Sequence, residues 1–162
     1  MANGAGPRLG EKARKTLDAL RERYPTSEAL LLPALHLAQE QWGGWLPDEA
    51  IEAVAGELGL APAKVYGVVT FYDLYHQEPV GRHRIRICTN LSCALRGATE
   101  IVETVADELG VEADEVTPDG RCSFTGFECL GACDIAPMAM IDDEYHGPLT
   151  PDAVRRLIRG LE

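Results

Sequence analysis

All five cysteines of this 162-residue chain lie between positions 88 and 133, and four of them form two closely spaced pairs. The first pair is Cys88 and Cys93, and the second is Cys129 and Cys133. Each pair begins at the end of a segment with strand-like alternation or β propensity. If those two strands are parallel neighbours, both pairs leave the sheet at the same edge. The cysteine spacing therefore favours a fold that brings four sulfur atoms to one place.

Four converging thiols have several chemical uses. Structural disulfides are disfavoured because nothing marks the chain as secreted. Thioredoxin-type redox chemistry requires two residues between its cysteines, and neither pair has that spacing. A zinc ion held by four thiolates is the main structural alternative, although zinc knuckles often use two-residue intervals. The wider intervals here are better matched to a binuclear iron–sulfur centre with two thiolates on each iron.

The remaining candidate ligands are expected to have structural roles. Cys122 is predicted to be a small buried residue at the start of a strand. Pro137 follows the second cysteine pair and precedes a strand, where it resembles the cis-proline position of thioredoxin-like folds, and this resemblance implies a cis Ala136–Pro137 peptide bond as a hypothesis. No ligand role is expected for the histidines because four thiols suffice for a binuclear centre. These histidines are His36, His76, His83 and His146.

The hydrophobic periodicity changes near residue 80, and the segment before this point is predicted to be helical. Four short helices are expected, over residues 11–23, 27–41, 48–58 and 64–72. They form a small bundle in a first domain, residues 1–80, that docks on a partner because so short a chain cannot hide every apolar face. The large side chains of this region are expected in the core rather than at an interface. They are Trp42, Trp45, Phe71 and Tyr72.

Strands and helices alternate in the second predicted domain, residues 81–162. Strands are expected over 84–88, 122–129, 138–142 and 145–146, and helices over 97–109 and after Thr150. The order is β-α-β-β-β-α, with a parallel first βαβ unit and an antiparallel final hairpin. The predicted fold class is α+β or α/β, a helical bundle followed by a thioredoxin-like domain.

Composition and charge exclude several classes of function. The net charge is −11, and positions 103–150 hold twelve acidic residues against one basic residue, Arg121. Such a surface repels phosphates, so nucleic acid is not an expected partner. The longest nearly apolar run, Ala29–Ala38, is too short for a membrane span, and a cytoplasmic protein without direct membrane insertion is expected. Glycine-rich phosphate-binding motifs are absent, so no nucleotide site is predicted on this chain.

Three segments carry a family resemblance: Cys-Thr-Asn-Leu-Ser-Cys-x-Leu-Arg-Gly, Thr-Pro-Asp-Gly, and Glu-Cys-Leu-Gly-Ala-Cys-x-x-Ala-Pro-Met. Together they resemble the NuoE-type 2Fe–2S thioredoxin-like subunit of the NADH dehydrogenase module of respiratory complex I. Upstream segments such as Val-Tyr-Gly-Val-Val-Thr-Phe-Tyr are similar to the same family, and the resemblance covers about residues 24–161. Asp134 stands where the family has glycine, and Cys122 lies outside the motifs.

The resemblance implies a cofactor, a partner and a function. Cys88, Cys93, Cys129 and Cys133 would ligate one 2Fe–2S cluster. The chain would be an electron-transfer subunit of an NADH:quinone oxidoreductase, without a substrate site of its own, in the peripheral arm of a membrane-associated complex. FMN and NADH would be bound only by a larger partner subunit, on which the N-terminal helices pack and with whose flavin the cluster exchanges one electron. The alternatives are the equivalent subunit of an NAD-dependent formate dehydrogenase or bidirectional hydrogenase, and a zinc-stapled adaptor.

Overall fold

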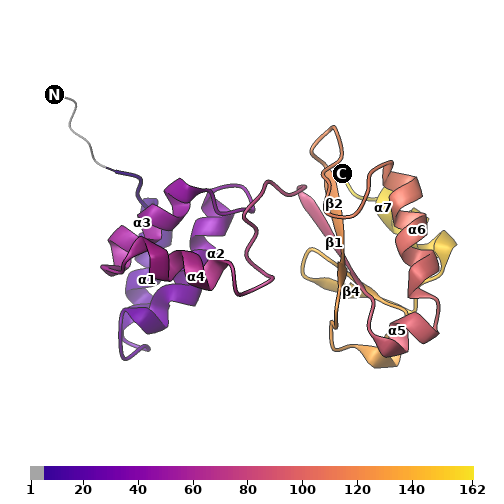
Figure 1. The fold of residues 1–162 in the computed structure, drawn as a ribbon, viewed down its shortest axis with the longest axis horizontal. Helices are drawn as coiled ribbons and strands as arrows, with labels where there is room; N and C mark the ends of the chain where they lie inside the picture. Colours follow the sequence, from indigo (N-terminus) through magenta and orange to yellow (C-terminus); the bar gives the residue numbers. More distant parts are fainter. Residues whose placement is uncertain (1–5) are drawn as a thin grey trace. The chain divides into compact units, whose positions relative to one another are not determined.

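The computed structural model describes residues 6–162, and the chain divides into two compact units, Met1–Pro79 and Val80–Glu162 (Figure 1). Each unit has its own cluster of buried apolar side chains. Over the described part of the chain, no helix is both long enough and apolar enough to cross a membrane.

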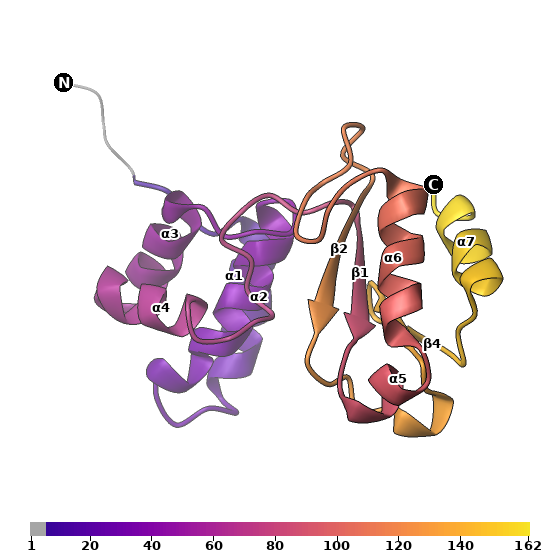
Figure 2. The same ribbon diagram turned by 45° about the vertical axis from the view of Figure 1, so that its right-hand side comes forward.

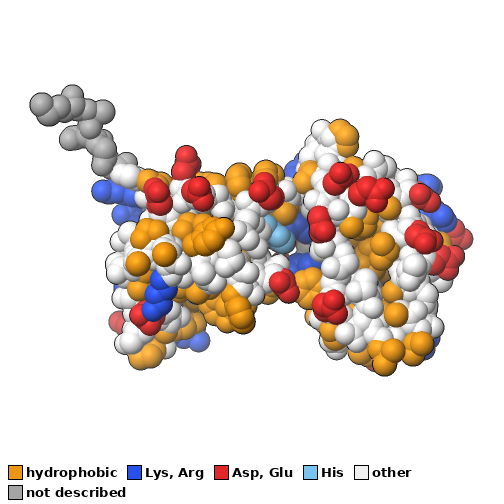
Figure 3. Space-filling view, in the orientation of Figure 1, with side chains coloured by type: hydrophobic (Ala, Val, Ile, Leu, Met, Phe, Trp, Pro, Cys, Tyr) orange, Lys and Arg blue, Asp and Glu red, His pale blue; other side chains and the backbone are white. Residues whose placement is uncertain are grey.

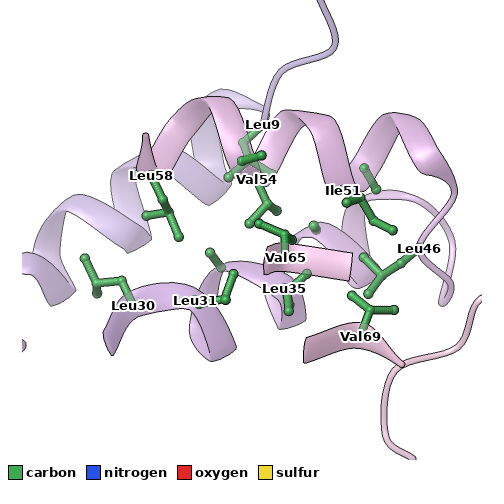
Figure 4. Close-up of a cluster of buried hydrophobic side chains, with 14 of the residues drawn as sticks. Leu9, Leu30, Leu31, Leu35, Leu46, Ile51, Val54, Leu58, Val65 and Val69 are labelled. Carbon is green, nitrogen blue, oxygen red and sulfur yellow. The ribbon is translucent and has the colours of Figure 1, made fainter. Parts of the chain in front are cut away.

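From residue 6 to Pro79, the first unit contains helices and no strand. Its helices are α1 (Glu11–Arg21), the 3-10 turn η1 (Glu28–Leu30), α2 (Leu31–Gln41), α3 (Asp48–Leu58) and α4 (Pro62–Val69). Helix α3 ends at Gly59, whose φ of +66° suits glycine. Helix α4 begins with Pro62, which needs no amide donor in the first turn. Figure 4 shows the core between these helices, where Leu35, Val54 and Val65 are fully buried.

Two aromatic side chains that were expected in this core lie at the surface instead. Phe71 is 75% exposed and Tyr72 is 43% exposed, so the prediction is wrong for both. Helix α4 ends at Val69, and the chain beyond it places Tyr75 in the core at 6% exposure, with its hydroxyl donating to the Leu32 carbonyl at 3.0 Å. Apolar side chains are visible on this unit's surface in Figure 3.

The second unit is built on a four-stranded sheet in the order β2-β1-β3-β4. Strands β1 and β2 are parallel (Figure 2), and the other neighbours are antiparallel. This arrangement confirms the predicted parallel unit and final hairpin. The elements in chain order are β1 (His83–Cys88), α5 (Leu91–Leu95), α6 (Ala98–Leu109), β2 (Cys122–Phe127), the 3-10 turn η2 (Cys133–Ile135), β3 (Ala139–Ile141), β4 (Glu144–His146) and α7 (Pro151–Arg159).

Helices α6 and α7 lie on the same side of the sheet in both ribbon views (Figures 1 and 2). Ile85 and Ile87 of β1 and Phe124 of β2 join the hydrophobic cluster that these helices complete. Because side chains alternate along a strand, Arg86 and Cys88 point to the opposite face of the sheet. The alternating pattern of β1 therefore separates the apolar core from the face that carries the first cysteine.

The structure corrects the sequence analysis around the cysteines. No helix is predicted between the strand at 84–88 and the helix at 97–109, but helix α5 forms there because the Asn90 side chain accepts a hydrogen bond from the Leu91 amide at 2.7 Å. Strand β2 ends at Phe127, short of the predicted end at Cys129. The Ala136–Pro137 peptide bond is cis, as hypothesised, and Gly147–Pro148 is a second cis bond that was not predicted.

Candidate metal centre

The parallel pairing of β1 and β2 carries both cysteine pairs to the same edge of the sheet. Cys88 is the last residue of β1 and is in register with Phe127, the last residue of β2. The Thr89 amide donates to the Phe127 carbonyl at 2.8 Å, so the two chains stay together for one residue beyond the strands. Cys129 follows two residues after Phe127. Both cysteine segments therefore leave the sheet side by side.

The four thiols lie in one neighbourhood. The Cys88 side chain is in hydrogen-bond contact with the side chains of Cys93 and Cys129. Cys93 in turn interacts electrostatically with Cys133. Across residues 6–162, no group of three or more histidine, cysteine, aspartate or glutamate side chains is arranged so that it could hold a metal ion. The sulfur atoms are thus associated through pairwise contacts that reach from the first cysteine pair to the second.

Burial divides the four cysteines into two kinds. Cys88 is 3% exposed and Cys93 is 1% exposed, whereas Cys129 and Cys133 are exposed. The two buried thiols belong to a small apolar cluster that also contains Ala98, Leu130, Ala136 and Met138. A group bound by all four sulfur atoms would be walled by apolar side chains on one side and open to solvent or a partner on the other.

Backbone amides donate hydrogen bonds to the buried sulfur atoms. Burial opposes ionisation of Cys88, but hydrogen bonds from the Leu130 and Asn90 amides and from the neighbouring thiols outweigh it and lower the pKa of this thiol. For Cys93, burial and the hydrogen bond to Cys88 raise the pKa, although the Met138 amide acts in the opposite direction. Backbone N–H donors are therefore directed at the two buried sulfur atoms and would stabilise negative charge on them.

Charged and apolar side chains surround the exposed part of this site. Glu128 and Asp134 flank the second cysteine pair and are both exposed. Their carboxylates oppose the addition of an electron nearby, whereas the N–H donors favour it. Leu91 and Leu95 of α5 project apolar surface beside the first pair, at 69% and 79% exposure.

Cys122 and the histidines have other surroundings. Cys122 is fully buried, burial raises the pKa of its thiol, and it is in register with His83 at the opposite end of the strands from Cys88. The His83 ring is hydrogen-bonded to Asp142 and to the Glu162 carbonyl, both at 2.9 Å. His36 stacks obliquely on Tyr75, with ring centroids 5.1 Å apart. The buried position of Cys122 agrees with its expected role as a small apolar residue.

The amide donors at Leu130 and Met138 were not found from the sequence. An amide is present at every residue except proline, so no residue type marks the ones that face a sulfur atom. The Asn90 amide, which lies between Cys88 and Cys93 in the chain, also donates to the Cys88 sulfur atom. Thiolate ligands with N–H···S hydrogen bonds are the donor set of iron–sulfur proteins, so the residues present fit such a cluster.

Comparison with known proteins agrees with this chemistry. The sequence profile of the thioredoxin-like [2Fe-2S] ferredoxin family matches residues 17–162. The E-type subunit of the NADH-quinone oxidoreductase of Rickettsia bellii is 42% identical over 142 residues, which cover 86% of this chain and 85% of the relative. Its counterpart in the same enzyme of Pseudomonas aeruginosa is 39% identical over 150 residues, or 93% of this chain and 90% of the relative.

Two further comparisons involve larger proteins. The mitochondrial NADH dehydrogenase [ubiquinone] flavoprotein 2 of Dictyostelium discoideum is 38% identical over 138 residues, which cover 84% of this chain and 56% of the relative. A crystal structure of an NAD+-reducing [NiFe]-hydrogenase in the H2-reduced state shares the fold, with a TM-score of 0.71 at 22% identity. That match covers 81% of this chain and 22% of the hydrogenase chain.

Proposed function

We propose that this chain, which belongs to the thioredoxin-like [2Fe-2S] ferredoxin family, is an electron-carrying subunit of an NADH:quinone oxidoreductase. The family identifies the cofactor as a 2Fe–2S cluster. In our proposal the four ligands are Cys88, Cys93, Cys129 and Cys133. The chain holds one electron at a time and has no substrate site of its own.

The observation that carries this proposal is the convergence of two cysteine pairs at the ends of two parallel strands. Cys88 is the last residue of β1, and its side chain contacts those of Cys93 and Cys129. Cys129 lies 41 residues after Cys88 in the chain. The relatives that match nearly the whole chain at about 40% identity are subunits of NADH-quinone oxidoreductases. The sulfur contacts support the ligand set, and the relatives support the host enzyme.

The chain's own groups have distinct tasks in this function. Cys88 and Cys93 anchor the buried side of the cluster, while Cys129 and Cys133 hold the exposed side. The amides of Leu130, Asn90 and Met138 hydrogen-bond the buried sulfur atoms and stabilise their negative charge. The cluster, when bound, accepts and returns one electron. Because the protein donors are already in place, little reorganisation accompanies that change of charge.

The electron partner in this proposal is a subunit that binds FMN and NADH. Leu91 and Leu95 give the partner an apolar contact beside the exposed cysteines. The helical unit contributes a second docking surface through Tyr66, Phe71 and Tyr72, which are 48%, 75% and 43% exposed. Both subunits belong to a peripheral arm on the cytoplasmic side of the membrane, and this chain reaches the membrane only through its partners.

The cofactor is tested on the purified full-length chain. We expect a reddish-brown protein with about two irons and two sulfides per chain, and an electron paramagnetic resonance (EPR) signal after reduction. Replacement of any ligand by serine, for example Cys133→Ser, removes most of the colour, whereas Cys122→Ser retains it. A colourless protein with one zinc per chain supports the zinc-stapled adaptor and contradicts the electron-carrier proposal.

The host enzyme is tested by isolating the chain with its natural partners. Copurification with an NADH-oxidising flavoprotein and quinone-reductase subunits is expected, and rapid-freeze EPR should show reduction of the cluster on addition of NADH. Copurification with a hydrogenase or formate dehydrogenase catalytic subunit instead identifies the alternative host. A Leu91→Glu/Leu95→Glu variant should weaken association with the flavoprotein and leave the iron content unchanged.

A further inference from the structure

Tyr145 is an exposed aromatic residue whose hydroxyl reaches the second cysteine segment. It occupies the middle of the short edge strand β4 and is 53% exposed. Its hydroxyl donates a hydrogen bond to the Leu130 carbonyl at 2.9 Å. Leu130 lies directly after Cys129, so this bond ties the edge strand to the loop between Cys129 and Cys133.

Leu130 is held at three points. Its side chain is 8% exposed and packs in the cluster that contains Cys88 and Cys93. Its amide donates to the Cys88 sulfur atom. Its carbonyl accepts from Tyr145, and the next residue, Gly131, turns the chain with a φ of +76°. The orientation of the Leu130 backbone therefore determines whether its amide faces the Cys88 sulfur atom, and Tyr145 holds one end of that residue.

The hydroxyl, rather than the packing of the ring, distinguishes this tyrosine. More than half of the Tyr145 surface is exposed, so burial of the ring contributes little. A phenylalanine would occupy the same place opposite Met140 in the sheet and lack only the hydrogen bond. The same kind of bond occurs in the helical unit, where Tyr75 donates to the Leu32 carbonyl at 3.0 Å, far from the cysteines in sequence and in a separate unit.

We propose that Tyr145 is a positioning residue that holds the Leu130 amide on the Cys88 sulfur atom, and thereby raises the reduction potential and the retention of the bound cluster. This inference rests on the proposed function. N–H···S hydrogen bonds stabilise the more negative reduced state, so loosening this one lowers the potential. Cys129 and Cys133 are already exposed, so water reaches that side of the cluster with or without the tyrosine.

The test compares Tyr145→Phe with Tyr75→Phe in the full-length, cluster-loaded protein. For Tyr145→Phe we expect the one-electron reduction equilibrium constant to fall about threefold to tenfold, tenfold being 59 mV. Cluster loss to a chelator should be about fivefold faster, the factor expected from one typical hydrogen bond. Exchange of the Leu130 amide hydrogen with D2O should also accelerate. Tyr75→Phe should change only the stability of the protein.

The outcomes separate this inference from the proposed function. If the unmodified chain binds no iron–sulfur cluster, the proposed function fails. If the cluster is present and Tyr145→Phe leaves its potential, its retention and the Leu130 amide exchange unchanged, the inference is overturned. Equal effects of the two variants would also overturn it, because retention would then follow stability alone. If the Tyr145→Phe protein cannot be loaded with a cluster, the exchange rate of the Leu130 amide hydrogen with D2O is compared between the metal-free variant and the metal-free natural chain. An unchanged exchange rate overturns the inference.

Discussion

Gly147→Ala provides a strong test of the geometry around the cysteines. A Cβ atom at Gly147 would lie 2.3 Å from the Ile135 carbonyl oxygen and 3.0 Å from the Met138 Cβ atom. Ile135 ends the turn η2, which begins at Cys133, and the Met138 amide donates to the Cys93 sulfur atom. The added methyl group therefore presses on two segments that hold cysteines.

The size of the effect follows from these distances. Ordinary contacts of a Cβ atom begin at 3.4 Å, so the Ile135 carbonyl must move by about 1 Å. Overpacking of this kind costs about 1–3 kcal/mol of unfolding free energy. A displacement of that size next to Cys133 should also disturb the ligand geometry. We therefore expect both a less stable protein and faster loss of the cluster.

Two other glycines provide matched controls. A Cβ atom at Gly81 would lie 2.2 Å from the Cys122 carbonyl carbon, at the end of the sheet away from the cysteine pairs. A Cβ atom at Gly126 would meet only the Thr89 methyl group, at 3.4 Å. Gly81→Ala should thus lose about as much stability as Gly147→Ala, about 1–3 kcal/mol, but keep its cluster. Gly126→Ala should change stability by less than about 1 kcal/mol.

Urea unfolding of the metal-free variants measures stability, and the decay of visible absorbance in the presence of a chelator measures cluster retention. A Gly147→Ala protein within about 0.5 kcal/mol of the natural chain would refute the close approach to Ile135. If Gly81→Ala loses its cluster as fast as Gly147→Ala, retention depends on stability alone. The argument from local displacement at Cys133 would then be wrong.

Three further predictions concern other parts of the second unit. Cys133→Ser should lower the unfolding free energy of the cluster-loaded protein, measured by urea unfolding, by up to about 4 kcal/mol. This is the chain-entropy scale for a crosslink that closes a loop of about 40 residues. Cys122→Ser should show only a small packing effect in the same measurement. The hydrogen bond that the His83 ring donates to the Asp142 carboxylate raises the pKa of His83 above its ordinary 6.5, and the hydrogen bond to the Glu162 carbonyl raises it further. Protonated His83 therefore stabilises the fold fully below pH about 6.5, and the stability difference between the natural chain and His83→Gln should shrink as the pH rises through the folded-state pKa. Arg86 is 6% exposed with a buried Nε atom that has no hydrogen-bond partner, so Arg86→Met should leave the metal-free protein equally stable or up to about 2 kcal/mol more stable in urea unfolding.

Much of the local structure could be predicted because its causes are local. The alternation of arginine and isoleucine before Cys88 predicts a strand with one buried face, and Ile85 and Ile87 are buried as expected. Thr150 accepts a hydrogen bond from the Ala153 amide and starts α7 where the sequence places a cap. The same local reasoning missed α5, although Asn90 is a favourable capping residue, because a helix of five residues has too short a pattern to recognise.

The candidate site was only partly accessible from the sequence. The spacing of the cysteines indicated two pairs at strand ends, and the parallel pairing of β1 and β2 confirms the edge at which they meet. Which thiols are buried was not predicted. Cys93 is buried because α5 turns it toward Ala98 and Met138, and Cys133 is exposed because the turn η2 lies at the surface.

The sequence by itself determined the elements and the chemistry they carry: apolar periodicity, capping residues and four thiols act through neighbours along the chain. The tertiary structure decided which of these groups meet. Phe127 stands beside Cys88 only through the strand register, and Leu130 directs its amide at Cys88 while Tyr145 holds its carbonyl. Such contacts join residues far apart in the chain, and they form only when burial of the shared core outweighs the entropy lost in bringing those segments together.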